Sequence, residues 1–412
     1  MYLRNAIKLL ALAAPGLVAS ISSAPLSTSG RWIVDSDGNN VTYAGANWPG
    51  AAEAMLPEGL QYQSIEYIVG KLKELGMNVI RLTYAIEMID DIYETGADVS
   101  IKTSLITALG ETNGTAIFED IIKNNPTFSE NTTRLEVYDA VATECYNQGI
   151  YVHLDNHVSK AEWCCSTTDG NAWFGDTYFN VTNWHRGWRY MAEHVKSLPG
   201  VKSIGMRNEL RSPDDDTALA DATYNWDTWY TNMVENANQV HAVNPDLLLF
   251  FSGLNYDTTL SPIPTASDLG NGTTFKKTDF AFSDKIVLEI HNYDNSATSC
   301  SSLESSLVSD GFDALETDDS DIVNVLPVVM TEFGYLMDNT THTEVYPTCL
   351  KEYLPSVHAG WMIWVLAGSY YIRQGTQDYD ETWGLLDHTW ENWRSVDAID
   401  NGIIPMVEAS LG

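Results

Sequence analysis

Two glutamates occupy equivalent places in the sequence, each at the end of a short apolar run. Glu209 ends the run that begins at Ser203, and Glu332 follows the run that begins at Val328. An acid that ends a buried strand faces a pocket lined by loops, and acids from two such strands can meet across it. Hydrolysis of a glycosidic bond uses a facing pair of carboxyl groups, one of them as the proton donor. The sequence therefore predicts acid–base chemistry on a sugar.

The elements that must position these acids recur eight times. Each apolar run is short and most are apolar on both faces, as parallel strands covered by helices are. The segments between the runs contain apolar residues at helical spacing, so we predict an α/β protein with a single (β/α)8 TIM barrel. A doubly wound open sheet is the alternative, but it has fewer strands and a Gly-rich first turn that this sequence lacks. The eight runs are Tyr43–Trp48, Asn78–Thr83, Ile150–His157, Ser203–Glu209, Leu247–Gly253, Lys285–Tyr293, Val328–Tyr335 and Gly360–Gly368.

Three segments modify this plan. Arg31–Asp35 and Asn40–Thr42 flank the turn signal Asp37-Gly38, which predicts a small N-terminal β-hairpin over the closed bottom of the barrel. The segment Tyr84–Gly149 is too long for one crossover helix, so we expect an insertion between strands two and three. The segment Asp294–Asn324 is acidic and is expected to be a loop.

The residues at the strand ends, taken in order, resemble those of glycoside hydrolase family 5, a cellulase-like family of retaining (β/α)8 enzymes. The similarity extends from about Trp32 to about Trp393, and Leu210 stands where many members carry Pro. The residues that match the family's motif are Arg81, His157, Asn208-Glu209, His291 with Tyr293, Glu332 and Trp364. The resemblance implies that Glu209 is the acid/base and that Glu332 is the nucleophile.

The physical requirements of that chemistry agree with these roles. Glu209 must hold a proton to protonate the leaving oxygen, so we expect its pKa to be raised. Arg81 and Tyr293 are expected to hold Glu332 as a carboxylate, and Asn208 to bind the sugar 2-hydroxyl. Retention requires the two carboxyl groups to lie about 5–5.5 Å apart.

The remaining polar strand-end residues receive supporting roles. His157 and His291 are expected to support the substrate site, with satisfied core histidines as the alternative, and Asp155 is expected to be a structural acid. Because the histidines lie on different strands without a ligand cluster, we expect no metal site. Hydrolysis by two acids also needs no cofactor.

Aromatic residues supply a second signal, because flat rings in rim loops can stack on sugar faces. The chain has 13 Trp, 21 Tyr and 11 Phe, and most are expected in the core. Trp48 and Trp364 are the best candidates for sugar platforms, whereas Trp163 and Trp173 could equally pack loops. Other aromatic residues in or after rim loops are Phe174, Trp184, Tyr256, Tyr370 and Trp383.

The net charge of −34 disfavours several classes of partner. So strong a polyanion repels phosphate backbones and anionic lipids, so nucleic-acid and membrane-surface functions are not expected. A neutral, β-linked carbohydrate fits better. The chain shows no membrane span after its N-terminal segment, and we expect a monomer.

The N-terminus resembles a secretory signal peptide, for which we assign residues 1–24. It has a basic start at Arg4 and Lys8, the short apolar stretch Leu9–Val18, and small residues at Ser22-Ser23-Ala24. A buried N-terminal helix is the alternative. Residues 25–412 are then expected to form one catalytic domain of a secreted, extracellular glycoprotein. Its six Asn-x-Ser/Thr sequons are at Asn40, Asn113, Asn131, Asn180, Asn271 and Asn339.

Five cysteines are an odd number for an exported protein, so at least one should be free. Cys145, just before a strand, is our choice for a buried free thiol, and Cys300 with Cys349 can bridge neighbouring loops. The adjacent pair Cys164-Cys165 cannot be assigned. A zinc site is the rival interpretation, but the spacing of a zinc motif is missing.

These observations predict a secreted retaining glycoside hydrolase that acts by double displacement, with cellulose or another β-glucan as the first choice of substrate. The resemblance also leaves mannan, xyloglucan, exo-glucosidase and glycolipid substrates open. A transglycosylase would use the same two acids. A carbohydrate-binding protein without turnover would not need both Glu209 and Glu332, and a structural wall glycoprotein would not need the polar set at the strand ends.

Overall fold

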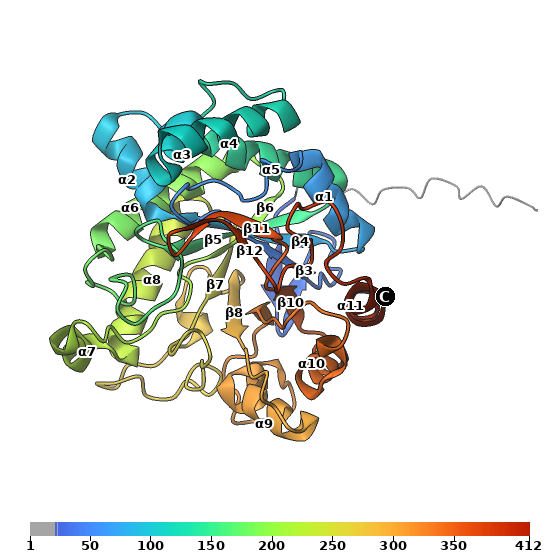
Figure 1. The fold of residues 1–412 in the computed structure, drawn as a ribbon. Helices are drawn as coiled ribbons and strands as arrows, with labels where there is room; N and C mark the ends of the chain where they lie inside the picture. The colour runs from blue at the N-terminus through green and yellow to red at the C-terminus, as the bar shows by residue number, and fades with distance from the viewer. Residues whose placement is uncertain (1–20, 23) are drawn as a thin grey trace, which may run out of the picture.

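Eight parallel strands close into a barrel in the computed structural model, which describes residues 21–22 and 24–412 (Figure 1). The strands lie in the order β10-β3-β4-β5-β6-β7-β8-β9, so chain neighbours are also neighbours in space. This confirms the (β/α)8 barrel and excludes the open doubly wound sheet. The predicted signal peptide lies outside the described residues except for residues 21, 22 and 24. The barrel strands are β3 Ala44–Trp48, β4 Val79–Ala85, β5 Tyr151–Val158, β6 Val201–Gly205, β7 Leu248–Phe251, β8 Ile286–His291, β9 Val328–Glu332 and β10 Gly360–Ile363.

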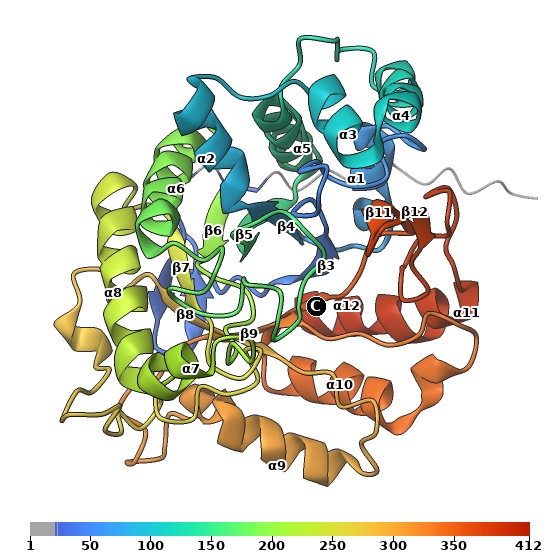
Figure 2. The ribbon, with the colours of Figure 1, turned by 60° about the vertical axis from the view of Figure 1, so that its left-hand side comes forward.

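Helices surround the strands, as Figure 2 shows. Their ends follow local sequence signals: in α5, Thr133 and Glu136 form a capping box, and Gly149 ends the helix at a φ of 80°. Among the described residues, no helix combines the length and the apolar character that crossing a membrane requires. The helices are α1 Ile65–Glu74, α2 Ile86–Thr95, α3 Ile101–Leu109, α4 Glu111–Asn124, α5 Arg134–Gln148, α6 Val181–His194, α7 Thr217–Thr223, α8 Trp226–Val243, α9 Cys300–Asp310, α10 Val345–Ser356, α11 Val396–Ala398 and α12 Ile404–Leu411.

The bottom of the barrel is closed by an apolar plug. Leu26 and Ile33, from the N-terminal segment, pack with residues at the starts of the barrel strands, such as Tyr43, Val79 and Tyr151. The predicted hairpin therefore lies where it was expected. Closure of this end leaves the opposite rim, where the strands end, as the place for chemistry.

The strands of the N-terminal hairpin differ from those predicted. Strands β1 Ser27–Ser29 and β2 Trp32–Val34 pair antiparallel, and the predicted second leg makes only a single bridge, between Val34 and Asn40. The Asp35 carboxylate accepts hydrogen bonds from the backbone N–H groups of Asp37 and Asn39, which bends the chain into a compact turn. That turn replaces the expected second strand.

The insertion between β4 and β5 is confirmed, and it consists of α2, α3 and α4 ahead of the crossover helix α5 (Figure 1). Arg134, at the start of α5 and 1% exposed, locks it in place. Its guanidinium lies 2.9 Å from an Asp91 oxygen and 2.8 Å from an Asp98 oxygen. One buried cation thus joins α2, the following loop and α5.

The acidic segment Asp294–Asn324 is not a plain loop, which corrects the prediction. It contains α9, capped by the Ser299 side chain, and buries Leu303 and Leu307 one helical turn apart. The Cys300–Cys349 disulfide then ties α9 to α10. Ser and Asp in this segment obscured the short apolar stripe on which the helix depends. After β10, strands β11 Ser369–Arg373 and β12 Thr376–Asp380 form a hairpin.

A substitution at Gly45 in β3 can test how closely the barrel strands pack. An added Cβ would lie 1.9 Å from the carbonyl oxygen of Val79, so we expect Gly45→Ala to destabilise the fold by at least about 1–3 kcal/mol. In Gly70→Ala the nearest atom is 3.9 Å away, within helix α1. Alanine at position 70 should therefore raise the free energy of unfolding by about 0.5–1 kcal/mol. Urea unfolding checks both, and equal midpoints for the two variants would contradict the tight β3–β4 approach.

Candidate active site

Arg81 occupies the centre of the rim and is fully buried. One terminal nitrogen, Nη1, donates to Asn47 Oδ1 at 2.9 Å and to a carboxylate oxygen of Glu332. The other, Nη2, donates to Asn208 Oδ1 at 2.8 Å and lies 3.0 Å from Asp155 Oδ1. A permanent positive charge therefore lies against two carboxylates, one of them Glu332, the predicted partner of the arginine, whereas the contact with Asn208 was not predicted.

Glu332 is fixed at both oxygens. The second oxygen accepts a hydrogen bond of 2.9 Å from the Tyr293 hydroxyl, as predicted. The guanidinium of Arg81 holds the first, so the carboxylate cannot rotate without losing a charge-assisted bond. This is the arrangement that a nucleophilic carboxylate needs.

Glu209 lies in the loop that follows β6 and has a left-handed backbone, at a φ of 47°. The Asp257 carboxyl accepts the backbone N–H of Glu209 at 2.7 Å and supports this conformation, which is costly for a residue other than glycine. Burial raises the pKa of Glu209, with Asp155 adding to the effect, although Arg211, His157 and Arg81 oppose it. Glu209 therefore keeps a proton to higher pH than an ordinary glutamic acid, as an acid catalyst must.

His291 connects the two acids. Its Nδ1 lies 3.1 Å from an oxygen of Glu209 and 3.8 Å from one of Glu332. Its Nε2 lies 3.0 Å from the Thr331 hydroxyl, which itself donates to Glu289. Burial lowers the pKa of His291 to about 4, with Glu332 opposing the effect. The ring is therefore neutral. Because the Thr331 hydroxyl donates to Glu289, we assign the ring proton to Nε2, which leaves Nδ1 to accept a hydrogen bond from protonated Glu209.

The acid pair is close. An oxygen of Glu209, a nitrogen of His291 and an oxygen of Glu332 all lie within 4.8 Å of one another. His291 and Glu332 are the last residues of β8 and β9, and Glu209 lies in the loop that follows β6. Carboxyl groups about 6.5–9.5 Å apart leave room for a water between them, and the Glu209 and Glu332 oxygens are closer than that.

Aromatic rings line one side of this centre. The Trp364 ring stacks on His157 at 5.5 Å and 10°, and His157 in turn binds Asp155 through Nδ1 at 2.8 Å. Trp364 also lines a cavity of about 300 Å³ with Tyr293 and Trp383. His157 thus supports the ring of Trp364, which stays the candidate for a sugar platform.

Trp48 is not part of this surface, which corrects the prediction. Its ring is fully buried, packs against Trp390 and donates its indole N–H to the carbonyl of Glu58. It has no exposed face for a sugar. Trp173 and Trp184 are also fully buried and pack loops and helices.

Several site residues escaped the sequence analysis. Asn47 and Thr331 lie inside predicted strands, and their polarity was a usable signal. Glu289, fully buried in β8, also left a signal in the sequence, because an acid inside an apolar strand needs a polar partner. Asp257 had no signal at all, since it lies in a loop with a left-handed φ of 58° that the sequence does not mark.

The same groups offer ligand atoms for a cation. Contrary to the expectation of no ligand cluster, Glu209, His291 and Glu332 form one within the described residues. An ion held there would occupy the place of the reacting sugar. The pKa of Glu209 is raised, so a cation bound there would have to displace the proton that this acid keeps.

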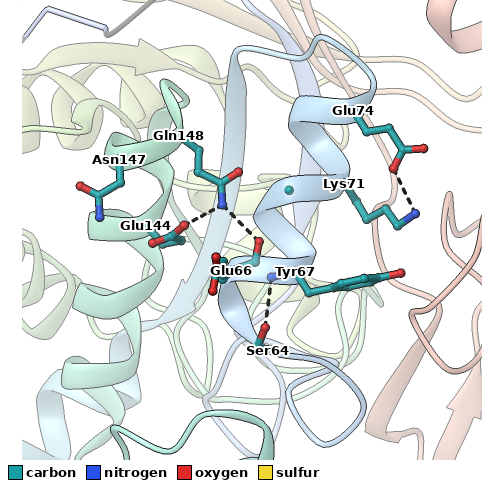
Figure 3. A pocket seen from close by; sticks show the side chains of 9 residues that line it. Ser64, Glu66, Tyr67, Lys71, Glu74, Glu144, Asn147 and Gln148 are labelled. Carbon is teal, nitrogen blue, oxygen red and sulfur yellow. Dashed lines mark hydrogen bonds and ion pairs between the residues drawn. The ribbon is translucent and has the colours of Figure 1, made fainter. Parts of the chain in front are cut away.

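A larger hollow of about 590 Å³ lies on the outside of the barrel, between α1 and α5 (Figure 3). Its polar groups bind each other: the Gln148 amide donates to Glu144 at 2.6 Å and to the carbonyl of Glu66. Lys71 and Glu74 pair at 3.1 Å on its edge. No strand of the barrel ends there, so this hollow carries none of the predicted chemistry.

Comparison with protein families gives one match across most of the chain. Residues 34–368 match the family described as Cellulase (glycosyl hydrolase family 5). A glycosyl hydrolase 5 family protein of Chamaecyparis obtusa is 33% identical over 410 residues, which cover 96% of this chain and 68% of that protein. An endoglucanase of Paenibacillus polymyxa is 22% identical over 56% of this chain and 50% of its own length.

Solved structures share the fold. An endocellulase of Pyrococcus horikoshii, in complex with cellotetraose, superimposes with a TM-score of 0.68 at 14% identity, covering 94% of this chain and 99% of that one. The catalytic domain of the major endoglucanase of Xanthomonas campestris gives 0.66 at 16% identity, covering 93% and 99%. A β-glucanase of Saccharophagus degradans gives 0.60 at 16% identity, covering 97% and 98%.

Substitution of Asp155 can test the charge balance around Arg81. Burial opposes its ionisation, but Arg81 and His157 outweigh burial and hold the pKa of the carboxyl below its usual 3.8. Asp155→Asn leaves a buried cation short of one anion and should cost about 3–5 kcal/mol of unfolding free energy near pH 7. Because the folded pKa is depressed, this difference is present above pH 3.8 and disappears as pH falls through the folded value.

Urea unfolding of wild type and variant over a pH series measures the effect. Glu74→Gln, which alters an exposed pair with Lys71, is the matched control and should change stability by less than about 0.5 kcal/mol. A cost that is the same for both variants, or that does not depend on pH, would contradict the role of Asp155.

Proposed function

We propose that this chain, which belongs to glycosyl hydrolase family 5, is a secreted β-glucan hydrolase that retains anomeric configuration. Its class, a cellulase-type glycoside hydrolase, follows from the family and from the endoglucanases it resembles. The observation that carries the stereochemical proposal is the approach of a Glu209 oxygen and a Glu332 oxygen to within 4.8 Å. Retaining enzymes place these groups about 5–5.5 Å apart, and inverting enzymes about 6.5–9.5 Å.

In the first step, the Glu332 carboxylate attacks the anomeric carbon while Glu209 gives its proton to the leaving oxygen. Tyr293 and Arg81 aim the attacking oxygens. The bond from the anomeric carbon to the leaving oxygen breaks, and a glycosyl ester of Glu332 forms. Asn208, held by Arg81, offers an N–H to the sugar 2-hydroxyl, a contact that strengthens in the transition state.

In the second step, Glu209 acts as a base. Having lost its proton, it takes one from water, and the water oxygen attacks the anomeric carbon from the side that the first product left. The ester bond breaks and restores the Glu332 carboxylate. Two inversions give net retention. A sugar hydroxyl in place of water would give transglycosylation, with no change in the residues.

A β-1,4-linked glucan is the proposed substrate. The support is that an endocellulase with the same fold binds cellotetraose and that relatives are endoglucanases. Mannan, other β-glucans, glycolipids and exo-action remain alternatives. Next to Trp364, the Arg373 guanidinium lies 3.6 Å from the centre of the Trp163 ring, so the β11–β12 hairpin meets the loop after β5. We infer that this contact narrows the cleft beside Trp364 and favours short oligosaccharides.

We also propose export and glycosylation. All six sequon asparagines are exposed in the structure, as attachment of a glycan requires. The acidic surface and the N-terminal segment support an extracellular monomer that acts on neutral polysaccharide. Mass spectrometry of the protein secreted by a eukaryotic host, before and after deglycosylation, tests the N-terminus and the glycans together.

The stereochemistry and the nucleophile can be tested together. We expect the first product from a β-1,4-oligoglucoside, followed by ¹H NMR, to be the β-anomer. Glu332→Ala should lower kcat by about 10⁴-fold or more, because the attacking group is gone. Added azide should then restore turnover and give the α-glycosyl azide, since it attacks once and inverts.

The matched control is Glu209→Ala. On a substrate with a good leaving group, azide should rescue it with the β-glycosyl azide, because Glu332 still forms the ester. An α-anomer as the first wild-type product would reject retention. Rescue of both variants with the same azide anomer would reject the assigned roles.

The pH dependence follows from the raised pKa of Glu209. The acid must be protonated, so kcat/KM should fall as pH rises through the pKa of Glu209, and this limb should lie above 4.5, its ordinary value. Glu209→Gln should remove the limb and retain activity only on dinitrophenyl glycosides, whose leaving group needs no proton. A wild-type limb at or below 4.5 would contradict the buried environment of the acid.

A further inference from the structure

The loop after β5 carries a second chemical feature at the active site. Cys164 and Cys165, adjacent in the chain, form a disulfide, and both residues are only partly buried. Their sulfurs and a carboxylate oxygen of Glu209 all lie within 4.8 Å of one another. Neither the acid pair nor the barrel fold needs a disulfide at this position beside Glu209.

Asn208 is in contact with this disulfide. Its Nδ2 lies 3.6 Å from the Cys164 sulfur and 3.5 Å from the Cys165 sulfur. The orientation of the amide is not arbitrary, because Oδ1 accepts from Arg81, which can only donate. The NH₂ group must therefore face the sulfurs. One N–H rests on the disulfide, and the other remains for a sugar hydroxyl.

Two arginines in the loop after β6 anchor the loop that carries the disulfide. The fully buried Arg207 donates to the Ser159 hydroxyl at 3.0 Å and to the carbonyl of Asn171 at 2.6 Å. Arg211 pairs with Asp169, which is 10% exposed in its side chain, at 2.5 Å. Two arginines that flank Asn208 and Glu209 thus hold both ends of the loop, so the sulfurs keep a fixed position relative to the acid.

Aromatic and cation–π contacts hold the same loop at Trp163. Trp163, the residue before the disulfide, packs edge-on against Tyr370 at 5.0 Å and against Trp364 at 6.2 Å. The guanidinium of Arg373 covers its ring. The residue before the disulfide is therefore held against Trp364, while the sulfurs themselves lie beside Glu209.

We propose that the Cys164–Cys165 disulfide is a positioning element of the sugar subsite, which orients the Asn208 amide toward the substrate 2-hydroxyl and presents an apolar face beside Glu209. The inference rests on the proposed function, because it names what one wall of that site does. A disulfide suits this role better than two thiols. The ring that joins adjacent cysteines fixes both sulfurs, and these sulfurs accept weakly and donate nothing, so they do not compete for the sugar.

Reduction should undo this arrangement. A dithiol such as dithiothreitol transfers two electrons and two protons: the S–S bond breaks, each cysteine becomes a thiol, and the reductant closes to its own cyclic disulfide. Each side chain can then rotate and donate an S–H, and Asn208 loses its fixed partner. Because the two cysteines are only partly buried, a small dithiol can reach the pair, whereas Cys349 of the other disulfide is buried.

The test compares Cys164→Ser/Cys165→Ser with wild type on an aryl β-cellobioside and on its analogue lacking the 2-hydroxyl at the reacting sugar. We expect kcat on the full substrate to fall about tenfold, the size of one hydrogen bond, with a smaller change in KM. On the 2-deoxy analogue the loss should shrink to less than about twofold, because the contact is absent from the start. The matched control, Cys300→Ser/Cys349→Ser, should leave the ratio of the two substrates unchanged.

A second measurement serves if the double variant does not fold. Wild type treated with dithiothreitol, with the thiols alkylated and counted by mass spectrometry, should show the same selective loss, and reoxidation should reverse it. Asn208→Ala should abolish the effect of reduction, since the disulfide acts through that amide.

Failure of the disulfide proposal can be distinguished from failure of the proposed function. Equal losses on both substrates, or unchanged kcat in the reduced enzyme, would overturn the inference while leaving a working hydrolase. Wild type that cleaves neither the aryl glycosides nor any β-glucan would instead reject the proposed function.

Discussion

The active site depends on the burial of one positive charge. Arg81 has no exposed surface, and an uncompensated guanidinium inside a barrel would cost several kcal/mol. Asp155 and Glu332 supply the anions, and the side chains of Asn47 and Asn208 supply neutral oxygens. Because these partners come from separate strand ends, the arginine holds the rim together. Glu332, the proposed nucleophile, lies where the charge of Arg81 needs an anion.

Burial has the opposite effect on the acids that lack a cation. Glu289 and Asp257 both have raised pKa values, that of Glu289 reaching about 8, because desolvation outweighs Arg81. Gly205 leaves the space that this polar layer needs, since a Cβ there would lie 2.9 Å from Asp155 Oδ1 and from His153 Nε2. Asp155, which pairs with Arg81, thus has a lowered pKa, whereas Glu289 and Asp257, which form no such pair, have raised pKa values. Glu209 belongs to the second group, which is why it can serve as an acid.

Much of the fold could be predicted because buried parallel strands leave a clear signal. All eight apolar runs became barrel strands, and the residues that end them lie at one rim. The failures have physical causes. Trp48 was placed on the surface because strand ends are ambiguous by one residue, and its side chain in fact turns into the core against Trp390. Helix α9 was missed because two leucines among serines and acids make too narrow a stripe to recognise.

By itself, the sequence determined the order of strands and helices and which residue types end each strand, since these depend on local patterns of apolar and polar residues. The tertiary structure alone decided the distances that make chemistry possible. The approach of Glu209 to Glu332 depends on barrel closure and on a left-handed backbone at Glu209 that Asp257 supports from another loop. The contact of Asn208 with the Cys164–Cys165 disulfide likewise joins two loops through the anchoring arginines. Such contacts join residues far apart in the chain, and no local pattern encodes them.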